Sequence, residues 1–96
     1  MRPSAALDLH RDAVRALIAA HRAVNPRVFG SVAAGTDTED SDLDLLVDAL
    51  PGTTLFDLGD LYGELQNLLG VRVDLVTPGD LSKYIRADVV AAARPL

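Results

Sequence analysis

Cysteine is absent from this chain of 96 residues, and that absence limits the chemistry available to it. Without thiols, neither disulfides nor thiolate zinc sites can form. Any metal ion must therefore be bound by oxygen or imidazole ligands. A ligand set of that kind favours Mg²⁺, with Mn²⁺ as the alternative.

Basic residues are scarce, since 9 Lys and Arg stand against 14 Asp and Glu. The formal net charge is −5 and the isoelectric point is near 4.7. Proteins that bind DNA or RNA normally use basic patches to contact phosphates, so this balance argues against a nucleic acid as a direct partner. If the protein handles a nucleotide, metal ions must supply most of the positive charge.

Long apolar runs are also missing. No stretch of about 18 apolar residues is present, and no segment has the charged start and apolar middle of a signal peptide. We therefore expect a soluble, cytoplasmic protein without a membrane partner. Apolar residues nonetheless make up 49% of the chain, which suffices for one core. Residues 1–96 are predicted to form a single small domain.

The spacing of apolar residues predicts helices that alternate with strands. A first helix is expected from Ala5 to about Ala23, capped by Ser4 and ended by Asn25-Pro26. The other predicted elements are a strand over 27–29, a helical turn over 32–34, a strand over 42–47, a helix over 54–69, a strand over 71–76 and a helix from Asp80 through Ala93. This order predicts an α/β (α+β) fold with a small mixed sheet of about three strands covered by helices.

The helix over 54–69 has the clearest local signals. Thr54 is followed three residues later by Asp57, a shorter relative of the capping-box acid, and Gly70 is placed to end the helix. Its leucines repeat at helical spacing and are expected to face the core. They are Leu55, Leu58, Leu61, Leu65, Leu68 and Leu69.

The stretch from Val28 to Asp48 concentrates the residues that carry chemistry. A Gly-Ser pair, Gly30 and Ser31, is followed after ten residues by Asp42 and Asp44. In a strand, these two carboxylates would point the same way, with Cα atoms about 6.6 Å apart. Adjacent carboxylates repel each other, and a cation between them removes that cost. The pair therefore predicts a metal site, with a solvated strand edge as the alternative.

Asp74, on the strand over 71–76, is the third candidate carboxylate. If this strand lies beside the strand of Asp42 and Asp44, Asp74 can face the same site. The alternative is that Asp74 simply pairs with Arg72, its neighbour on the same strand face.

Two rival motifs fail against the sequence. A calcium-binding EF-hand loop beginning at Asp40 needs glycine where Leu45 stands and glutamate where Pro51 stands. A P-loop needs lysine followed by Ser or Thr where Thr36 and Asp37 stand.

The remaining pattern, GS-x10-D-x-D with a later aspartate, resembles the nucleotidyltransferase superfamily typified by DNA polymerase β. More narrowly, the chain looks like the minimal nucleotidyltransferase domains, because VRVDLVTPGDLSKYIRADVVAAARPL is similar to the end of such domains. The resemblance covers nearly the whole chain and implies a polymerase β-like fold.

The resemblance also implies roles for individual residues. Asp42 and Asp44 would bind divalent metal ions, and Gly30 and Ser31 would contact the nucleotide phosphates. A third carboxylate in the family completes the metal site or activates the acceptor, and that role falls to Asp74. These three aspartates are thus the candidate catalytic and metal-binding residues.

The chain departs from the family pattern in one respect. Typical members carry an arginine near the phosphates between the Gly-Ser pair and the aspartates, whereas residues 32–41 contain no Lys or Arg. Three acids occur there instead, Asp37, Glu39 and Asp40, and we expect them to be solvated. Either triphosphate affinity is weak or a partner supplies the cation, and Arg72 is the best substitute within the chain.

Small free-standing domains of this family are commonly encoded as antitoxins beside a HEPN-domain ribonuclease toxin. The resemblance implies a Mg²⁺-dependent protein adenylyltransferase that transfers AMP from ATP to a tyrosine hydroxyl of its cognate HEPN toxin. One alternative is a transferase that acts on a small molecule such as an aminoglycoside. The other is a catalytically weak antitoxin that inhibits the toxin by binding alone.

Overall fold

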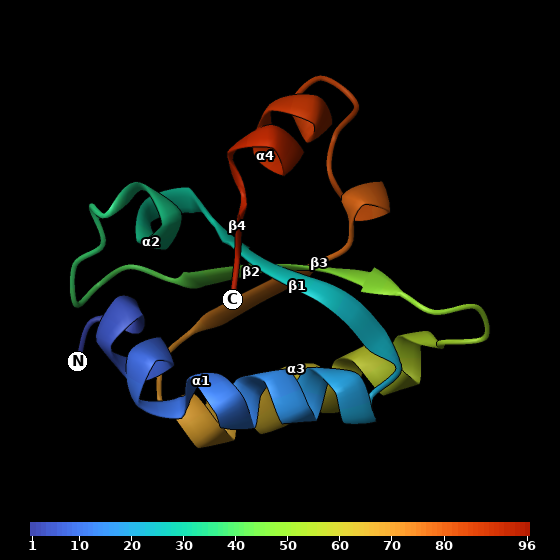
Figure 1. Cartoon of the computed structure of the whole chain (residues 1–96), viewed down its shortest axis with the longest axis horizontal. Helices are drawn as coiled ribbons and strands as arrows, with labels where there is room; N and C mark the ends of the chain where they lie inside the picture. Colours follow the sequence, from blue (N-terminus) through green and yellow to red (C-terminus); the bar gives the residue numbers. More distant parts are fainter.

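The computed structural model describes all 96 residues. Its helices pack on one mixed sheet (Figure 1). The helices are α1 (Pro3–Ala20), α2 (Gly30–Ala34), α3 (Leu55–Leu69) and α4 (Arg86–Ala92), with a short 3-10 helix η1 (Pro78–Asp80). The strands are β1 (Ala23–Phe29), β2 (Leu43–Ala49), β3 (Val73–Val76) and β4 (Arg94–Pro95). No helix is both long enough and apolar enough to cross a membrane.

The sheet has the order β3-β2-β1-β4. Strand β2 runs antiparallel to β1 and parallel to β3, and β4 pairs antiparallel with β1. The predicted fold class, a small mixed sheet with helices, is therefore confirmed, but the sheet has four strands rather than about three. Strand β4 escaped prediction because it has two residues, one of them proline, and exists only by pairing with β1.

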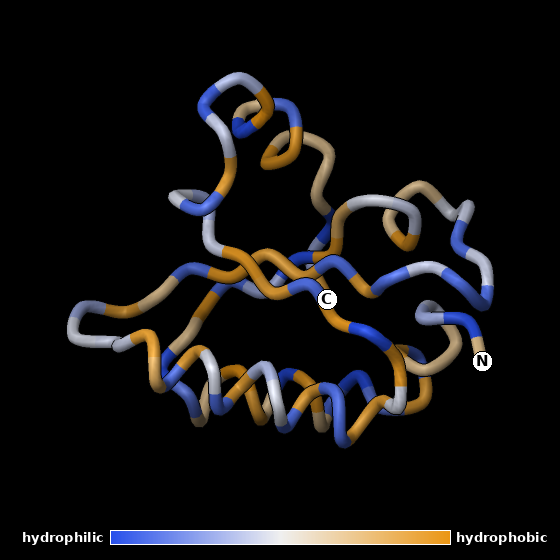
Figure 2. Tube along the Cα trace, turned by 180° about the vertical axis from the view of Figure 1, so that it is seen from behind, coloured by the Kyte–Doolittle hydropathy of each residue, from blue (hydrophilic) through white to orange (hydrophobic).

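Helices α1 and α3 lie side by side on one face of the sheet (Figure 1). In Figure 2 both helices alternate between hydrophilic and hydrophobic segments, as amphipathic helices do, while the crossing strands are largely hydrophobic. Leu43 and Leu45 of β2 are fully buried in the same cluster as Ile18 of α1 and Leu61 of α3. Each leucine buried in this way stabilises the fold by about 1.5–3 kcal/mol.

The leucine stripe of α3 is confirmed except at its start. Thr54 and Asp57 form the reciprocal capping box, and Gly70 ends the helix in the left-handed conformation at φ +67°. Leu61, Leu65 and Leu69 are buried. Leu55, however, in the first turn of α3, is 86% exposed.

Helix α1 differs from its prediction at both ends. It begins at Pro3 with Arg2 in the N-cap position, and it ends at Ala20 rather than near Ala23. Asn25 and Pro26, expected to end the helix, lie within β1. Asn25 has a positive φ of 53°, and the pairing of β1 with β2 changes register at this point. The turn-forming residues therefore produce a bulge in a strand instead of a helix end.

The helix-capping role expected of Ser4 belongs to Asp37, 33 residues away. Asp37 Oδ2 accepts a hydrogen bond of 2.9 Å from the backbone N–H of Ser4, in the first turn of α1. This bond lowers the pKa of the Asp37 carboxyl. Asp37 is buried, so the expectation that it is solvated is wrong, whereas Glu39 and Asp40 are exposed as expected.

The last predicted helix is also shorter than expected. Asp80 does not cap a helix that continues through Ala93. It belongs to η1 and accepts a hydrogen bond of 2.9 Å from the N–H of Thr77. Helix α4 begins only at Arg86, and it stands on the side of the sheet opposite α1 and α3 (Figure 1).

Candidate active site

Asp44 belongs to one of the two inner strands of the sheet. It lies on β2, whose neighbours Leu43 and Leu45 point into the core under α1 and α3. Because side chains alternate along a strand, Asp44 faces the opposite side of the sheet, away from these two helices. Its backbone is flanked by Phe29 of β1 and by Asp74 of β3.

The parallel pairing of β2 with β3 brings two predicted carboxylates together. Asp44 is the register partner of Asp74, just as Leu43 is the partner of Val73. Register partners on adjacent strands have side chains on the same face. The expectation that Asp74 can face the site of Asp44 is therefore confirmed at the level of strand pairing.

The surroundings of Asp44 oppose its ionisation. Burial is the largest cause, and the negative charges of Asp74 and Asp42 add to it, so that the pKa of Asp44 rises to about 6. A hydrogen bond with Asp74 acts in the same direction. A cation next to this carboxylate pair would reverse the electrostatic part of the shift.

Gly30 lies in the connection between β1 and β2 and comes close to Asp44. It is the first residue of α2, with φ at +66°, a conformation that favours glycine. A Cβ atom at this position would overlap Asp44 Oδ2 and lie 3.1 Å from Asp44 Cγ. Ser31 follows in α2 and is half-buried, and Gly35 ends this short helix at φ +73°. The Gly-Ser pair thus lies beside the carboxylate cluster.

Asp42 lies just before β2 and has a cationic partner. Arg72 Nε donates to Asp42 Oδ1 over 2.9 Å, and Arg72 Nη2 donates to the carbonyl of Asp40 over 2.5 Å. The alternative in which Arg72 pairs with Asp74 is therefore wrong. Strand register gives the reason, because Leu43 N–H bonds to the Arg72 carbonyl and places Arg72 beside Asp42.

The carboxylates of Asp42, Asp44 and Asp74 have the right chemistry for a divalent cation, but the three do not point toward one common position. Their oxygen ligands are the kind that Mg²⁺ prefers. Asp44 and Asp74 lie side by side, but no three carboxylate or imidazole groups in the chain form a cluster that could hold a metal ion. Asp42, the third expected ligand, is engaged by Arg72.

A second polar cluster on the same sheet was missed by the sequence analysis. Arg27 of β1 is buried and donates to the carbonyl of Asn25 over 2.6 Å and to Asp48 Oδ1 over 3.3 Å. The side chain of Asn25 also donates to Asp48, and this bond is the main reason that the pKa of Asp48 is lowered. The register change at Asn25 brings these groups together, and no motif indicates it.

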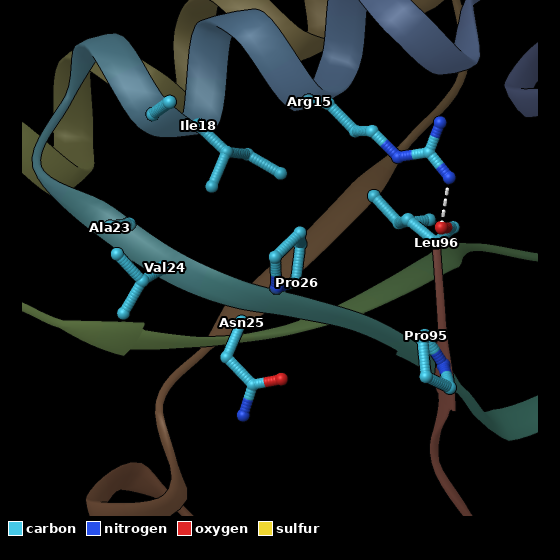
Figure 3. A pocket seen from close by; sticks show the side chains of 9 residues that line it. Arg15, Ile18, Ala23, Val24, Asn25, Pro26, Pro95 and Leu96 are labelled. Carbon is cyan, nitrogen blue, oxygen red and sulfur yellow. Dashed lines mark hydrogen bonds between the residues drawn. The ribbon is translucent and has the colours of Figure 1, made fainter.

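The largest cavity in the molecule lies apart from these carboxylates. It has a volume of about 380 Å³ and lies between the end of α1, β1 and the C-terminal residues (Figure 3). Arg15, whose guanidinium donates to the carbonyl of Leu96, lines one side of it. None of the residues singled out for the candidate site lines this cavity.

Comparison with known proteins places this geometry in a family. The sequence model of the nucleotidyltransferase domain family matches residues 10–95. The protein adenylyltransferase MntA of Thermococcus cleftensis is 43% identical over 63 residues, which are 66% of this chain and 64% of that protein. A Methanocaldococcus jannaschii protein, provisionally named a protein adenylyltransferase, is 33% identical over 73 residues, or 76% of this chain and 78% of its own length. This chain thus matches somewhat less than two thirds of MntA.

Solved structures support the same assignment. One, provisionally identified as a minimal nucleotidyltransferase, has 49% sequence identity and a TM-score of 0.87, covering 97% of this chain and 95% of that one. A toxin–antitoxin crystal structure with AMP-PNP has a TM-score of 0.74 at 24% identity, covers 88% of this chain and 69% of that one, and shows likeness of fold alone. With a matching domain model over residues 10–95, this chain belongs to the nucleotidyltransferase domain family.

Proposed function

We propose that residues 1–96 form one nucleotidyltransferase domain that acts as an antitoxin-type protein adenylyltransferase. It transfers AMP from ATP to a tyrosine hydroxyl of a cognate HEPN toxin and requires Mg²⁺. The observation that carries this proposal is the side-by-side pairing of Asp44 and Asp74 next to Gly30, in a chain of this family. Because ATP is the substrate, we place the reaction in the cytoplasm.

The relatives support the choice of a protein acceptor and a toxin partner. The relative from Thermococcus cleftensis is named a protein adenylyltransferase. Structures with the same fold come from a toxin–antitoxin complex, one of them with AMP-PNP. The acidic charge of this chain suits docking onto a basic, RNA-binding protein, because complementary potentials speed encounter.

The proposed reaction assigns work to each residue of the site. Asp42, Asp44 and Asp74 would hold Mg²⁺, which when bound neutralises phosphate charge and favours loss of the acceptor proton. The Gly-Ser pair lies beside Asp44, so the backbone amides of the pair and the Ser31 hydroxyl would donate to phosphate oxygens. Arg72 provides a further phosphate contact within the chain.

The bonds that change are few. The tyrosine oxygen attacks the α-phosphorus, the bond from the α-phosphorus to the bridging oxygen breaks, and diphosphate leaves. In this scheme Asp74, the more exposed of the paired carboxylates, accepts the tyrosine proton. The chain otherwise positions the reactants and offsets charge, as phosphoryl-transfer sites generally do.

A second candidate, an antitoxin that inhibits by binding alone, is favoured by two observations. The three aspartates do not form a ready metal cluster, and residues 32–41 have no Lys or Arg to hold a triphosphate. Under this alternative the carboxylates would be dispensable for silencing the toxin.

Intact-mass spectrometry of the toxin separates the two candidates. After incubation with ATP, Mg²⁺ and this chain, the toxin should gain the mass of one AMP unit on a tyrosine. The variant Asp42→Asn/Asp44→Asn should leave the toxin unmodified and active. Silencing without a mass change, equally by wild type and double variant, would favour inhibition by binding and end the adenylyltransferase proposal.

A further inference from the structure

Arg72 is the cationic partner of Asp42, one of the three candidate metal ligands. Its guanidinium spans two acceptors, Asp42 Oδ1 at 2.9 Å and the carbonyl of Asp40 at 2.5 Å. Asp42 therefore already has a positive partner, and it is the one carboxylate of the proposed three that has an ion pair. This contact follows from the pairing of β2 with β3.

We propose that Arg72 is an exchangeable counter-ion of the metal site. In the chain without a divalent cation, Arg72 neutralises Asp42. With Mg²⁺ and ATP bound, Asp42 would hold the cation, and Arg72 would leave Asp42 and contact the triphosphate. This inference rests on the proposed function. It assigns Arg72 two negatively charged partners in succession, first Asp42 and then the triphosphate.

The exposure of the pair makes this exchange feasible. The side chain of Arg72 is 72% exposed and that of Asp42 is 49% exposed. Ion pairs this exposed contribute little net stability, because water solvates the separated charges well. Arg27 offers the contrast, since its side chain is 9% exposed and bound to both Asn25 and Asp48. A cation can displace Arg72 from its carboxylate far more easily than Arg27.

The charge distribution explains why the triphosphate would receive Arg72. The segment over 32–41, which should lie near the phosphates, contains three acids and no Lys or Arg. Arg72 already lies at the edge of this segment, because it donates to the Asp40 carbonyl. The guanidinium fork also matches phosphate oxygens well, so a short movement exchanges a carboxylate for a phosphate.

Two opposite effects of one substitution test this inference. Arg72→Gln frees Asp42, so the nucleotide-free protein should bind Mn²⁺ about two- to fivefold more tightly than wild type, the range expected for an exposed ion pair. The same variant should bind an unreactive ATP analogue with Mg²⁺ about tenfold more weakly, because a charged hydrogen bond to phosphate is lost. Mn²⁺ binding is read from the electron paramagnetic resonance of the free ion, and nucleotide binding from calorimetry.

A matched control removes the same charge elsewhere. Arg11 makes an exposed ion pair of 2.6 Å with Asp8 on α1. Arg11→Gln should change neither affinity by more than the small effect of net charge. Arg72→Lys should keep the metal affinity near wild type but lose part of the nucleotide affinity, because lysine retains the charge and lacks the fork.

The outcomes separate this inference from the proposed function. Mn²⁺ affinity in Arg72→Gln that is equal to or below the wild-type value would overturn the exchange, as would the absence of Mn²⁺ binding in both proteins. An unchanged affinity of Arg72→Gln for the ATP analogue would overturn the proposed contact between Arg72 and the triphosphate. Tighter Mn²⁺ binding in the variant, together with no AMP transfer by wild type, would remove the adenylyltransferase proposal and leave the exchange at Asp42 standing.

Discussion

Gly30 and Asp44 are in contact across the sheet, with no space for a side chain between them. A Cβ atom on Gly30 would lie 3.1 Å from Asp44 Cγ and would overlap Oδ2. The positive φ of Gly30, +66°, adds a conformational reason for glycine. The Gly-Ser pair therefore shapes the site first by letting the Asp44 carboxylate lie against the backbone of Gly30.

Gly30→Ala should abolish Mn²⁺ binding, because the new methyl group pushes Asp44 out of position. Gly35→Ala is the matched control, since Gly35 has a similar φ of +73° but nothing within 4 Å of its added Cβ. Both variants should lose about 1–2 kcal/mol of stability from left-handed backbone strain. Thermal melting and Mn²⁺ titration of both proteins check this. Equal loss of Mn²⁺ affinity in the two variants would contradict the steric role of Gly30.

Asp44 should make the metal-free protein less stable as the pH rises. Its pKa is raised from 3.8 to about 6, so the folded chain retains a proton that the unfolded chain releases near pH 4. The stability linked to this proton is fully present below pH 3.8 and is lost as the pH rises through 6. In EDTA, the Tm of Asp44→Asn should therefore rise relative to the Tm of wild type as the pH increases from 4 to 7. If the Tm values of wild type and Asp44→Asn instead change in parallel over this pH range, the pKa of Asp44 is not raised in the folded protein.

Asp74→Asn should separate nucleotide binding from turnover. If Asp74 accepts the tyrosine proton, the variant keeps much of its affinity for ATP and loses about 10²–10⁴-fold in transfer rate. Its stability should not fall, since Arg72 pairs with Asp42 instead. A melting curve and a transfer assay on one sample measure both quantities. A lower Tm with an unchanged rate for each folded molecule would assign Asp74 a structural role.

Asp37→Ala should destabilise the protein by removing the hydrogen bond to Ser4 at the start of α1. Because that bond lowers the pKa of Asp37, its contribution is present above pH 3.8 and is lost as the pH falls further. Glu39→Ala, an exposed acid in the same loop, serves as the control and should leave the Tm unchanged. Thermal melting at pH 7 and pH 3 measures both variants. A Tm of Asp37→Ala equal to that of Glu39→Ala at pH 7 would show that the hydrogen bond between Asp37 and Ser4 does not stabilise the fold.

Local sequence signals predicted the elements whose causes are local. Thr54, Asp57 and Gly70 define the ends of α3 through capping geometry, and the alternation around Asp44 predicted its strand. The start of α1 and the long helix expected after Asp80 were wrong. At the start of α1 the deciding partner, Asp37, is distant in the chain. After Asp80 the deciding contact is local, because Asp80 accepts a hydrogen bond from the N–H of Thr77 and belongs to η1.

By itself, the sequence determined which side chains were available for chemistry: two aspartates one residue apart, a third on a later strand, and a glycine at the end of β1. Only the tertiary structure decided how these groups pair. The β2–β3 register sets Asp44 against Asp74 and Asp42 against Arg72. A shift of that register by one residue would set Asp44 opposite Val73 or Leu75 and turn Asp74 to the other face of the sheet, because side chains alternate along a strand. Register depends on the whole core beneath the sheet, which no local pattern specifies.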